Sequence, residues 1–439
     1  MTSLIPSLGG PVFTIVAFVV ALLVIVAVHE YGHYIVGRWT GIHADVFSVG
    51  MGKVLWSRVD KRGTKWQLAA IPAGGYVKFR GDANAASVGG DDGVPGYDPR
   101  TTMMGAPLWA RALTVAAGPV ANFILAALIF AGYLMYEGKP SEELVLESTY
   151  EVPAAFQSEL LPGDRIIAVG DVVFGEEGAN IDTLPDTLLQ DYTIVRDGAE
   201  MVVKGPHPII SRVDSLTPRS AADDAKLRVG DFITAIDGEP VNAFRDIVAA
   251  VGAAEGTPIT LEVWRDGETF DVELAARYQD EPQADGSYAQ FWRIGIGGTF
   301  FFDPATDPIG PWEALKLGVD RLWFTITMSL SGLWEIMTGG ISTCNLSGPV
   351  GIAQASGSMA AQGAQSYVLF LGMLSAAVGL LNLFPIPILD GGHLVFHAYE
   401  AVARRRPSDR ALNFLMVGGL AIIAGLMTFA LLNDLVLCP

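Results

Sequence analysis

The sequence predicts a polytopic α-helical membrane protein with about four transmembrane helices, a re-entrant β-hairpin and two small, mostly-β domains. Three observations support this fold class. The 439-residue chain is 51% hydrophobic and only 17% charged. Four apolar stretches approach or exceed the roughly 20 residues that a membrane-spanning helix needs. An acidic segment between the second and third stretches contains an internal repeat.

The four predicted spans lie near residues 11–37, 112–136, 366–389 and 411–433. A fifth apolar stretch, 312–338, carries five charged side chains along its length. Charged residues are costly inside a bilayer, whereas an amphipathic helix can lie in the interface. We therefore expect residues 312–338 to form a helix on the membrane surface.

Charge is distributed unevenly along the chain, whose net charge is −19. Between Glu137 and Asp307, acidic residues outnumber basic ones by 33 to 12, whereas residues 38–111 and the Arg-rich loop 397–411 are basic. Basic loops stay in the cytoplasm, so both basic segments are predicted there and the acidic region on the opposite side. No basic face or motif indicates a nucleic-acid partner.

The first span ends in the sequence His29-Glu30-Tyr31-Gly32-His33. Positions i and i+4 share one face of a helix, so His29 and His33 can direct ring nitrogens at one metal ion. Glu30 lies beside that face, where it can take a proton from a water molecule at the metal. The pattern also occurs by chance, but each ionisable group in an apolar helix costs about 2.5 to 3.5 kcal/mol. A metal is the simplest partner for such a cluster.

A catalytic zinc ion takes three protein ligands and a water molecule, so one further ligand is needed. A third histidine six residues after His33 is excluded, because residue 39 is Trp. The best candidate is Asp390 in the segment NLFPIPILDGGH (382–393), where two prolines interrupt the helix at the end of the third span. Irregular backbone at membrane depth must be buried or line a wet cavity. His393 remains the rival ligand.

The acidic region contains two related units. Residues 160–171 align with 227–238, and residues 193–203 align with 262–272. Each unit has a Gly-Asp turn before an alternating strand and later an Asp-Gly hairpin turn, which predicts two mostly-β domains. The second unit strongly resembles a PDZ domain, which binds a peptide as an added strand. The first resembles one less well, and it is either a peptide-binding domain or a PDZ-shaped spacer.

HEYGH in the first span together with NLFPIPILDGG in a late span resembles the site-2 protease family, the intramembrane zinc metalloproteases. Three further segments are similar to the bacterial RseP type of that family: AAGPVANFILA (116–126), NLSGPVGIAQASG (345–357) and TKWQLAAIPAGGYVKF (64–79). The last of these looks like its re-entrant β-hairpin, in which we expect Pro72-Ala-Gly-Gly75 to form the turn. Ala377 departs from that type, which can have Asn there.

This resemblance and the residues together imply a zinc metalloendopeptidase with one Zn²⁺ per chain, held by His29, His33 and Asp390, with Glu30 as the general base. Its substrates would be the transmembrane segments of single-span proteins, such as anti-sigma factors or remnant signal peptides. A transmembrane helix must unwind to be cut, because its carbonyls are already hydrogen-bonded. The residues expected to hold the unwound substrate are Asn382, Gly74, Gly75 and Val77.

The resemblance also implies a location and a partner set. We expect a multi-pass protein of the bacterial inner membrane with periplasmic PDZ domains and an active site near the cytoplasmic side. The partners would be membrane-spanning substrates, lipid and peptide ligands of the PDZ domains, in an envelope stress response controlled by regulated intramembrane proteolysis. The PDZ pair would exclude substrates that still carry bulky outer domains.

The expected domains are the first half of the membrane core (1–137), a PDZ-like domain (138–206), a PDZ domain (207–277), a connector (278–310) and the second half of the core (311–439). Cys344 and Cys438 are the only cysteines, and we expect two free thiols. The alternative functions are a catalytically silent PDZ scaffold in the membrane and a metal transporter with PDZ appendages. A silent scaffold would lose the Glu or one ligand, whereas this chain keeps all four residues.

Overall fold

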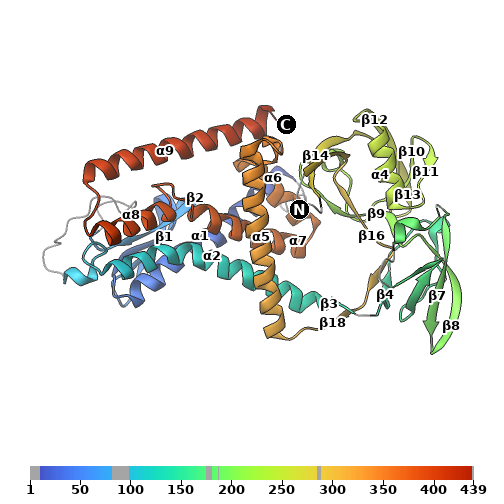
Figure 1. Cartoon of the computed structure of the whole chain (residues 1–439), viewed down its shortest axis with the longest axis horizontal. Coiled ribbons are helices and arrows are strands. Elements are labelled where there is room, and N and C mark those ends of the chain that lie inside the picture. Colours follow the sequence, from blue (N-terminus) through green and yellow to red (C-terminus); the bar gives the residue numbers. More distant parts are fainter. Residues whose placement is uncertain are drawn as a thin grey trace, which may run out of the picture. The chain divides into compact units, whose positions relative to one another are not determined.

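The computed structural model describes residues 10–81, 98–141, 143–174, 180–185, 187–283 and 288–437. These residues belong to two compact units (Figure 1). The helical unit comprises Met1–Tyr133, Pro311–Gly339 and Thr343–Pro439, and the β unit comprises Leu134–Gly310 and Gly340–Ser342. The long β unit is thus an insertion between two halves of the helical unit.

Four helices of the described chain are long and apolar enough to cross a membrane, as the sequence predicts. They are α1 (Pro11–Trp39), α2 (Leu108–Glu137), α7 (Ala364–Asn382) and α9 (Asp409–Leu432). The third span is shorter than expected, because α7 ends before the two prolines of the following loop, which cannot continue a helical hydrogen-bond ladder. Helix α8 (Asp390–Ala403) begins directly after that loop.

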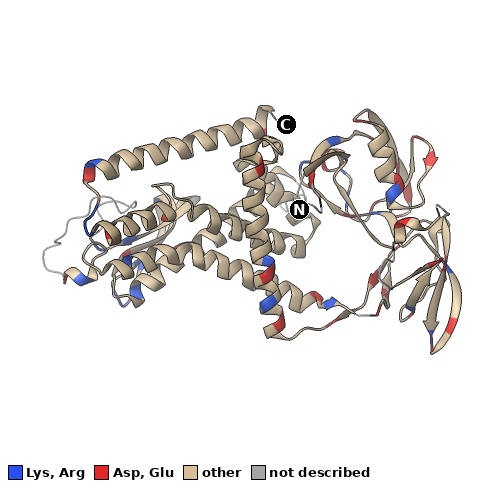
Figure 2. Cartoon of the chain, viewed as in Figure 1, with Lys and Arg blue, Asp and Glu red and all other residues tan. Residues whose placement is uncertain are grey.

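Helix α5 (Pro311–Thr338) is not among these span-like helices. It lies crosswise to α1, α2 and α9 within the helical unit (Figure 1). The ribbon of α5 in Figure 2 is coloured for charged residues mainly along its first half, whereas α9 has Lys, Arg, Asp or Glu only at its beginning. The large exposed residues of α5 include Trp312, Trp323 and Trp334. This combination of features is typical of a helix that lies in a membrane interface.

The predicted hairpin within residues 64–79 is wrong in its pairing. Residues Lys65–Phe79 form one long strand, β2, which pairs with β1 (Ala44–Val59). The connecting turn lies at residues 60–64 and not at Pro72–Gly75. Val46 of β1 pairs with both Lys65 and Lys78, so the two halves of β2 flank the first half of β1. Strand propensity predicted that residues 64–79 are extended. Their partner, β1, lies in a segment for which no strand was predicted.

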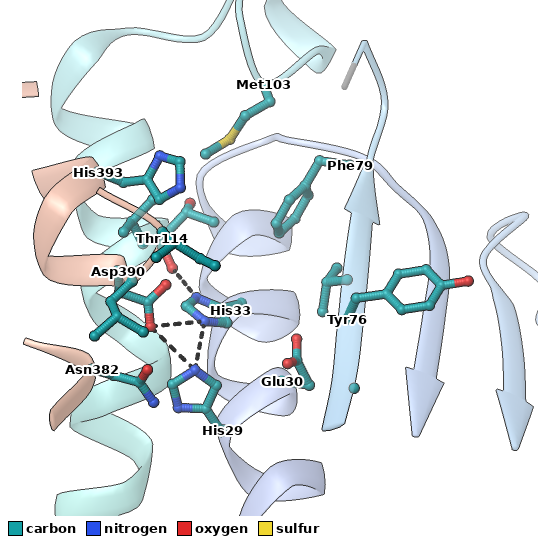
Figure 3. A pocket seen from close by; sticks show the side chains of 15 residues that line it. His29, Glu30, His33, Tyr76, Phe79, Met103, Thr114, Asn382, Asp390 and His393 are labelled. Atoms are coloured by element: carbon teal, nitrogen blue, oxygen red, sulfur yellow. Dashed lines mark hydrogen bonds and ion pairs between the residues drawn. The ribbon is translucent and has the colours of Figure 1, made fainter. Parts of the chain in front are cut away.

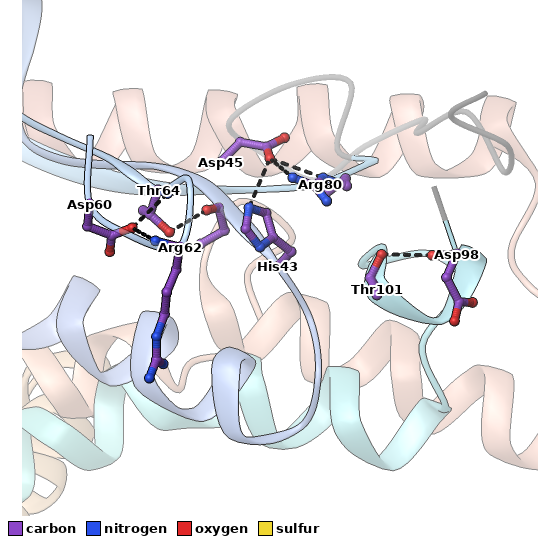
Figure 4. Close-up of polar contacts among 9 residues, drawn as sticks. His43, Asp45, Asp60, Arg62, Thr64, Arg80, Asp98 and Thr101 are labelled. Atoms are coloured by element: carbon purple, nitrogen blue, oxygen red, sulfur yellow. Dashed lines mark hydrogen bonds and ion pairs between the residues drawn. The ribbon is translucent and has the colours of Figure 1, made fainter. Parts of the chain in front are cut away.

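Local polar contacts fix this sheet at its turn and at its ends (Figure 4). Asp60 Oδ1 accepts hydrogen bonds from the backbone N–H groups of Arg62 (2.8 Å) and Thr64 (3.0 Å), which closes the turn. Arg80, just after β2, donates two hydrogen bonds to Asp45 Oδ1, at 3.0 and 3.2 Å. These contacts hold the strands of the sheet together, and both strands pack against α1.

The β unit contains the two predicted modules. Module 1 has the sheet order β6-β5-β7-β8, and module 2 the order β13-β12-β10-β9-β16. The strands of module 1 are β4 (Leu146–Thr149), β5 (Arg165–Val169), β6 (Val172–Val173), β7 (Leu189–Arg196) and β8 (Ala199–Pro206). Those of module 2 are β9 (Ile209–Leu216), β10 (Phe232–Ile236), β11 (Glu239–Pro240), β12 (Pro258–Arg265) and β13 (Glu268–Ala275), with helices α3 (Ala221–Asp224) and α4 (Phe244–Ala253).

One ion pair recurs at equivalent positions of the two modules. Arg196 donates from Nε and Nη2 to the two carboxylate oxygens of Asp164, both at 2.7 Å. Arg265 makes the same two contacts with Asp231, at 2.5 and 2.6 Å. Both carboxylates are almost fully buried and join the Gly-Asp turn to the hairpin strand. The internal repeat of the sequence is therefore a structural repeat as well.

The segment 278–310, expected to be a connector, supplies strands to both modules. It contains most of β14 (Arg277–Pro282) and all of β15 (Tyr288–Arg293), β16 (Ile296–Phe300), β17 (Phe302–Pro304) and β18 (Thr306–Asp307). Strand β16 pairs with β9 of module 2, and β17 pairs with β4 of module 1. Strand β18 pairs with β3 (Lys139–Pro140), so the two ends of the insertion lie side by side.

The expectation of two free thiols is corrected, because Cys344 is disulfide-bonded. The other cysteine of the chain, Cys438, lies outside the described residues. Cys344 is in the short helix Thr343–Asn345, whose Thr343 carbonyl accepts a 2.8 Å hydrogen bond from Asn433 Nδ2. The fold thus brings the segment around residue 344 to the end of α9, a long-range approach that spacing alone does not reveal.

Candidate active site

Three side chains with metal-ligating atoms meet where α1 approaches the start of α8. His29 and His33 come from α1, and Asp390 is the first residue of α8. The two histidine Nε2 atoms are 3.1 Å apart, and Asp390 Oδ2 lies 3.1 Å from the first and 3.5 Å from the second. Figure 3 shows the three groups facing one another. Within the described part of the chain, this is the one cluster found to have metal-site spacing.

These distances fit a zinc ion. Zinc takes nitrogen and oxygen ligands at about 2.0 to 2.2 Å in a tetrahedral arrangement, which puts neighbouring ligand atoms about 3.3 Å apart. The chemistry of the set also fits, since two imidazoles and one carboxylate leave a fourth position open for water. Asp390 Oδ2 is buried and faces the Nε2 atoms of both histidines, as expected for three ligand atoms that share one cation.

The ring of His33 is held from behind by α2. Its Nδ1 lies 2.8 Å from the backbone carbonyl oxygen of Thr114, to which it can only donate. A proton on Nδ1 leaves the lone pair of Nε2 free to ligate a metal. Behind His29, the side chain of Asn122 lies 3.3 Å from Nδ1.

Glu30 lies beside the cluster and faces the sheet (Figure 3). The backbone N–H of Val77 in β2 lies near its carboxylate. Glu30 and the cluster border one cavity of about 220 Å³, which also includes part of β2 and the start of α8. Besides the three ligand residues, it is lined by Glu30, Gly75, Tyr76, Val77, Phe79, Met103, Thr114, Val115, Asn382, Ile388, Leu389 and His393.

Helix α8 is tied to α2 at its far end. Arg111 is buried near the start of α2 and donates two hydrogen bonds to the Glu400 carboxylate, at 2.7 and 2.9 Å. These bonds and the Arg111 charge hold the pKa of Glu400 below its ordinary value, although burial opposes the shift. The ion pair gives α8 a fixed anchor ten residues beyond Asp390.

The structure brings most of the predicted site residues together. The three proposed metal ligands line the cavity, and so do Glu30, Asn382, Gly75 and Val77. Gly74 does not line it, and a side chain there would meet Met51 of β1. His393 lines the cavity but is outside the three-residue cluster, so the geometry favours Asp390 as the third ligand.

Sequence reasoning did not assign the residues of α2 that contact the histidines. A Cβ atom at Gly118 would lie 2.3 Å from His33 Nε2 and 2.8 Å from His29 Cε1, so only glycine lets α2 pass this close. Thr114 and Asn122 lie one turn to either side of it. Gly118 and Asn122 belong to the AAGPVANFILA segment, whose likeness to a family motif was visible without any indication of its role.

Comparisons with known proteins agree with this site. The model of Peptidase family M50 matches residues 17–426. A putative zinc metalloprotease of Agrobacterium fabrum is 36% identical, with 99% of both chains covered. The regulator of sigma-E protease RseP of Escherichia coli is 32% identical, covering 95% of this chain and 97% of that protein. The PDZ domain of an SdrC-like protein from Listeria monocytogenes matches 20% of this chain and 84% of that one, at 19% identity and a TM-score of 0.17.

The fold and the site together define an intramembrane zinc metalloprotease, a metalloendopeptidase whose cavity lies among span-like helices. The chain belongs to peptidase family M50, the site-2 protease family.

Proposed function

We propose that this protein hydrolyses peptide bonds within the transmembrane segments of single-span membrane proteins. His29, His33 and Asp390 hold one zinc ion per chain, and Glu30 acts as the general base. The single observation that carries this proposal is the convergence of three ligand atoms beside a carboxylate at the end of a span-like helix.

Zinc bound there would lower the pKa of a water molecule toward neutrality and polarise the scissile carbonyl. Glu30 accepts a proton from the attacking water and passes it to the leaving amine. The Val77 N–H holds the Glu30 carboxylate in position for both transfers.

We further propose that the second half of β2 holds the substrate in an extended form. Residues 75–79 pair with β1 on one side, and several of them border the cavity. An unwound substrate segment gains backbone hydrogen bonds from such an edge, and each unsatisfied group would otherwise cost several kcal/mol in hydrocarbon. A side chain at Gly75 would collide with Glu30 Cγ at 2.9 Å, so glycine keeps this approach open.

Asn382, the last residue of α7, is proposed to hydrogen-bond the substrate backbone from the opposite wall of the cavity. Its carboxamide can both donate to a carbonyl and accept from an N–H, which suits an extended chain.

The proposed setting is the bacterial inner membrane. The charge distribution favours a periplasmic β unit and a site near the cytoplasmic side. The substrates proposed are anti-sigma factors or remnant signal peptides in an envelope stress response, in line with relatives that are named regulators of sigma-E protease. The PDZ-like modules are proposed to take peptide ligands and to exclude substrates with bulky outer domains.

The test uses the full-length protein in detergent or liposomes. Metal analysis should find one zinc per chain, and a labelled single-span peptide should be cut within its apolar segment. Glu30→Gln should keep its zinc and lose activity by about 10²-fold or more, because the amide cannot accept the proton. Cleavage that survives complete removal of zinc, or a Glu30→Gln enzyme with wild-type activity, would refute the proposal.

A further inference from the structure

We infer that Asn122 is the positioning residue of His29: its carboxamide oxygen accepts a hydrogen bond from Nδ1–H of His29 and so presents the unprotonated Nε2 to the metal. This inference rests on the proposed metal site. It gives a specific role to a side chain of the α2 segment that the sequence left without one.

The first support is the position of the Asn122 side chain. Asn122 is fully buried in α2, and its Nδ2 atom lies 3.3 Å from His29 Nδ1. In this orientation Nδ2 would donate, which requires the histidine proton on Nε2, the atom that faces His33 and Asp390. A protonated Nε2 cannot ligate a metal, so the orientation and the ligand role are incompatible.

Rotation of the carboxamide by half a turn removes the conflict. The oxygen and nitrogen of an amide have nearly the same shape, and hydrogen-bonding chemistry decides which one faces a neighbour. Asn122 Oδ1 is buried without a hydrogen-bond partner where it now points, so the rotation sacrifices no contact of that oxygen. After rotation Oδ1 accepts from Nδ1–H, and His29 has the tautomer that a zinc ligand needs.

The second support is the matching arrangement behind the other histidine. His33 Nδ1 lies 2.8 Å from the Thr114 carbonyl oxygen, an acceptor that fixes the same tautomer. Thr114, Gly118 and Asn122 are spaced by four residues and so share one face of α2. Gly118 brings this face against both rings. Helix α2 therefore offers each ring one acceptor, a backbone carbonyl for His33 and a side chain for His29.

The third support is that the backbone of Asn122 is itself fixed. Ser375 Oγ of α7 donates a 2.9 Å hydrogen bond to the Asn122 carbonyl oxygen, and both residues are buried. This contact provides a matched control, because Ser375→Ala disturbs the packing at the same point without touching the Asn122 side chain.

The experiment compares Asn122→Leu, Asn122→Asp and Ser375→Ala in the full-length chain, each combined with Glu30→Gln so that no proteolysis occurs. Zinc affinity is measured by competition with a chelator, and the absorption spectrum of the Co²⁺ form reports the ligand set. We expect Asn122→Leu to weaken zinc binding by about 10- to 100-fold, the usual effect of losing a partner of a metal-ligating histidine. Asn122→Asp keeps an acceptor and should bind zinc at least as tightly as the parent, and Ser375→Ala should stay within about threefold of it.

Two results would overturn the inference while leaving the metal site in place: an Asn122→Leu protein with the parent's zinc affinity, or equal losses in the Leu and Asp variants. Asn122→Ala provides the same comparison if the Leu variant does not fold. A parent protein that binds no zinc at all would instead refute the proposed function together with this inference.

Discussion

The carboxylate of Asp390 in the helical unit and those of Asp164 and Asp231 in the β unit have opposite kinds of partner. In the β unit, Asp164 and Asp231 are each neutralised by an arginine that donates two hydrogen bonds. In the helical unit, Asp390 Oδ2 faces the Nε2 atoms of two imidazoles, at 3.1 and 3.5 Å, in place of an arginine. A buried carboxylate that is neutralised by an arginine stabilises a fold. Several metal-ligating groups that converge on one point instead indicate a functional site. The proposed catalytic residues therefore belong to the helical unit, and the repeated ion pairs of the β unit have a structural role.

The largest expected effect is on Asp390. Asp390→Asn replaces a ligating anion by a neutral amide, so both zinc content and proteolysis should fall, activity by about 10³-fold or more. Metal analysis of the purified protein and peptide cleavage check this. His393→Ala is the matched control and should retain zinc. If His393→Ala lost the metal and Asp390→Asn kept it, the assignment of the third ligand would have to be reversed.

The second-largest effect is expected from a substitution in β2, at Val77 beside the proposed base Glu30. Val77→Pro removes the one backbone N–H that is proposed to hold Glu30, and it bends the strand edge. We expect cleavage of helical substrates to fall by about 10- to 100-fold with zinc content unchanged. An unstructured peptide separates the two roles: if it is cut equally slowly, the loss comes from Glu30, and if it is cut normally, from the strand edge. Full activity on both substrates would exclude either role.

A smaller effect is expected from removing the β unit. Residues 141–305 can be replaced by a short linker, because β3 and β18 pair at the two ends of the insertion. The truncated enzyme should still cut small single-span substrates, since every proposed catalytic residue lies in the helical unit. It should discriminate less, by several-fold, against substrates with folded outer domains. Undiminished discrimination in a cleavage competition would remove the size filter from the proposal.

Removing one of the repeated ion pairs of the β unit should lower its stability without affecting the proposed metal site. Asp231→Ala leaves the Arg265 charge unpaired and should destabilise module 2 by about 2 kcal/mol or more. Hydrogen exchange of β10 and β12 in the full-length protein measures this loss. Zinc content should stay at the wild-type level, and a drop in metal binding would contradict the separation of the two units.

The smallest effect is a pH dependence of module 1. Burial raises the pKa of Asp164, but the Arg196 hydrogen bonds, the Leu161 amide and the Arg196 charge outweigh it and hold the pKa below its ordinary value. A lowered folded pKa gives stability that is present above the unfolded pKa of about 3.9 and is lost as the pH falls through the folded value. Exchange protection of β5 and β7, corrected for intrinsic rates, should decline below about pH 4. Asp164→Asn should lack this component, and an identical decline in that variant would assign it to other groups.

Much of the molecule is visible in the sequence because it depends on local patterns. Apolar length predicted the four span-like helices, helical spacing put His29 and His33 on one face, and turn signals revealed the two modules. Asp390 was predicted to be the third ligand because irregular backbone in an apolar segment must be buried or line a wet cavity. The structure brings Asp390 to the two histidines. In each case, neighbouring residues in the chain carry the information.

Only the tertiary structure decided which distant segments meet. The register of β1 with β2, the strands that residues 278–310 give to both modules and the contact of Asn433 with Thr343 all depend on tertiary pairing. The same holds for Asn122 behind His29. A strand segment or an amide side chain has the same local signal whichever partner it takes. The partner is set by how whole helices and sheets pack, because that packing buries the largest apolar area.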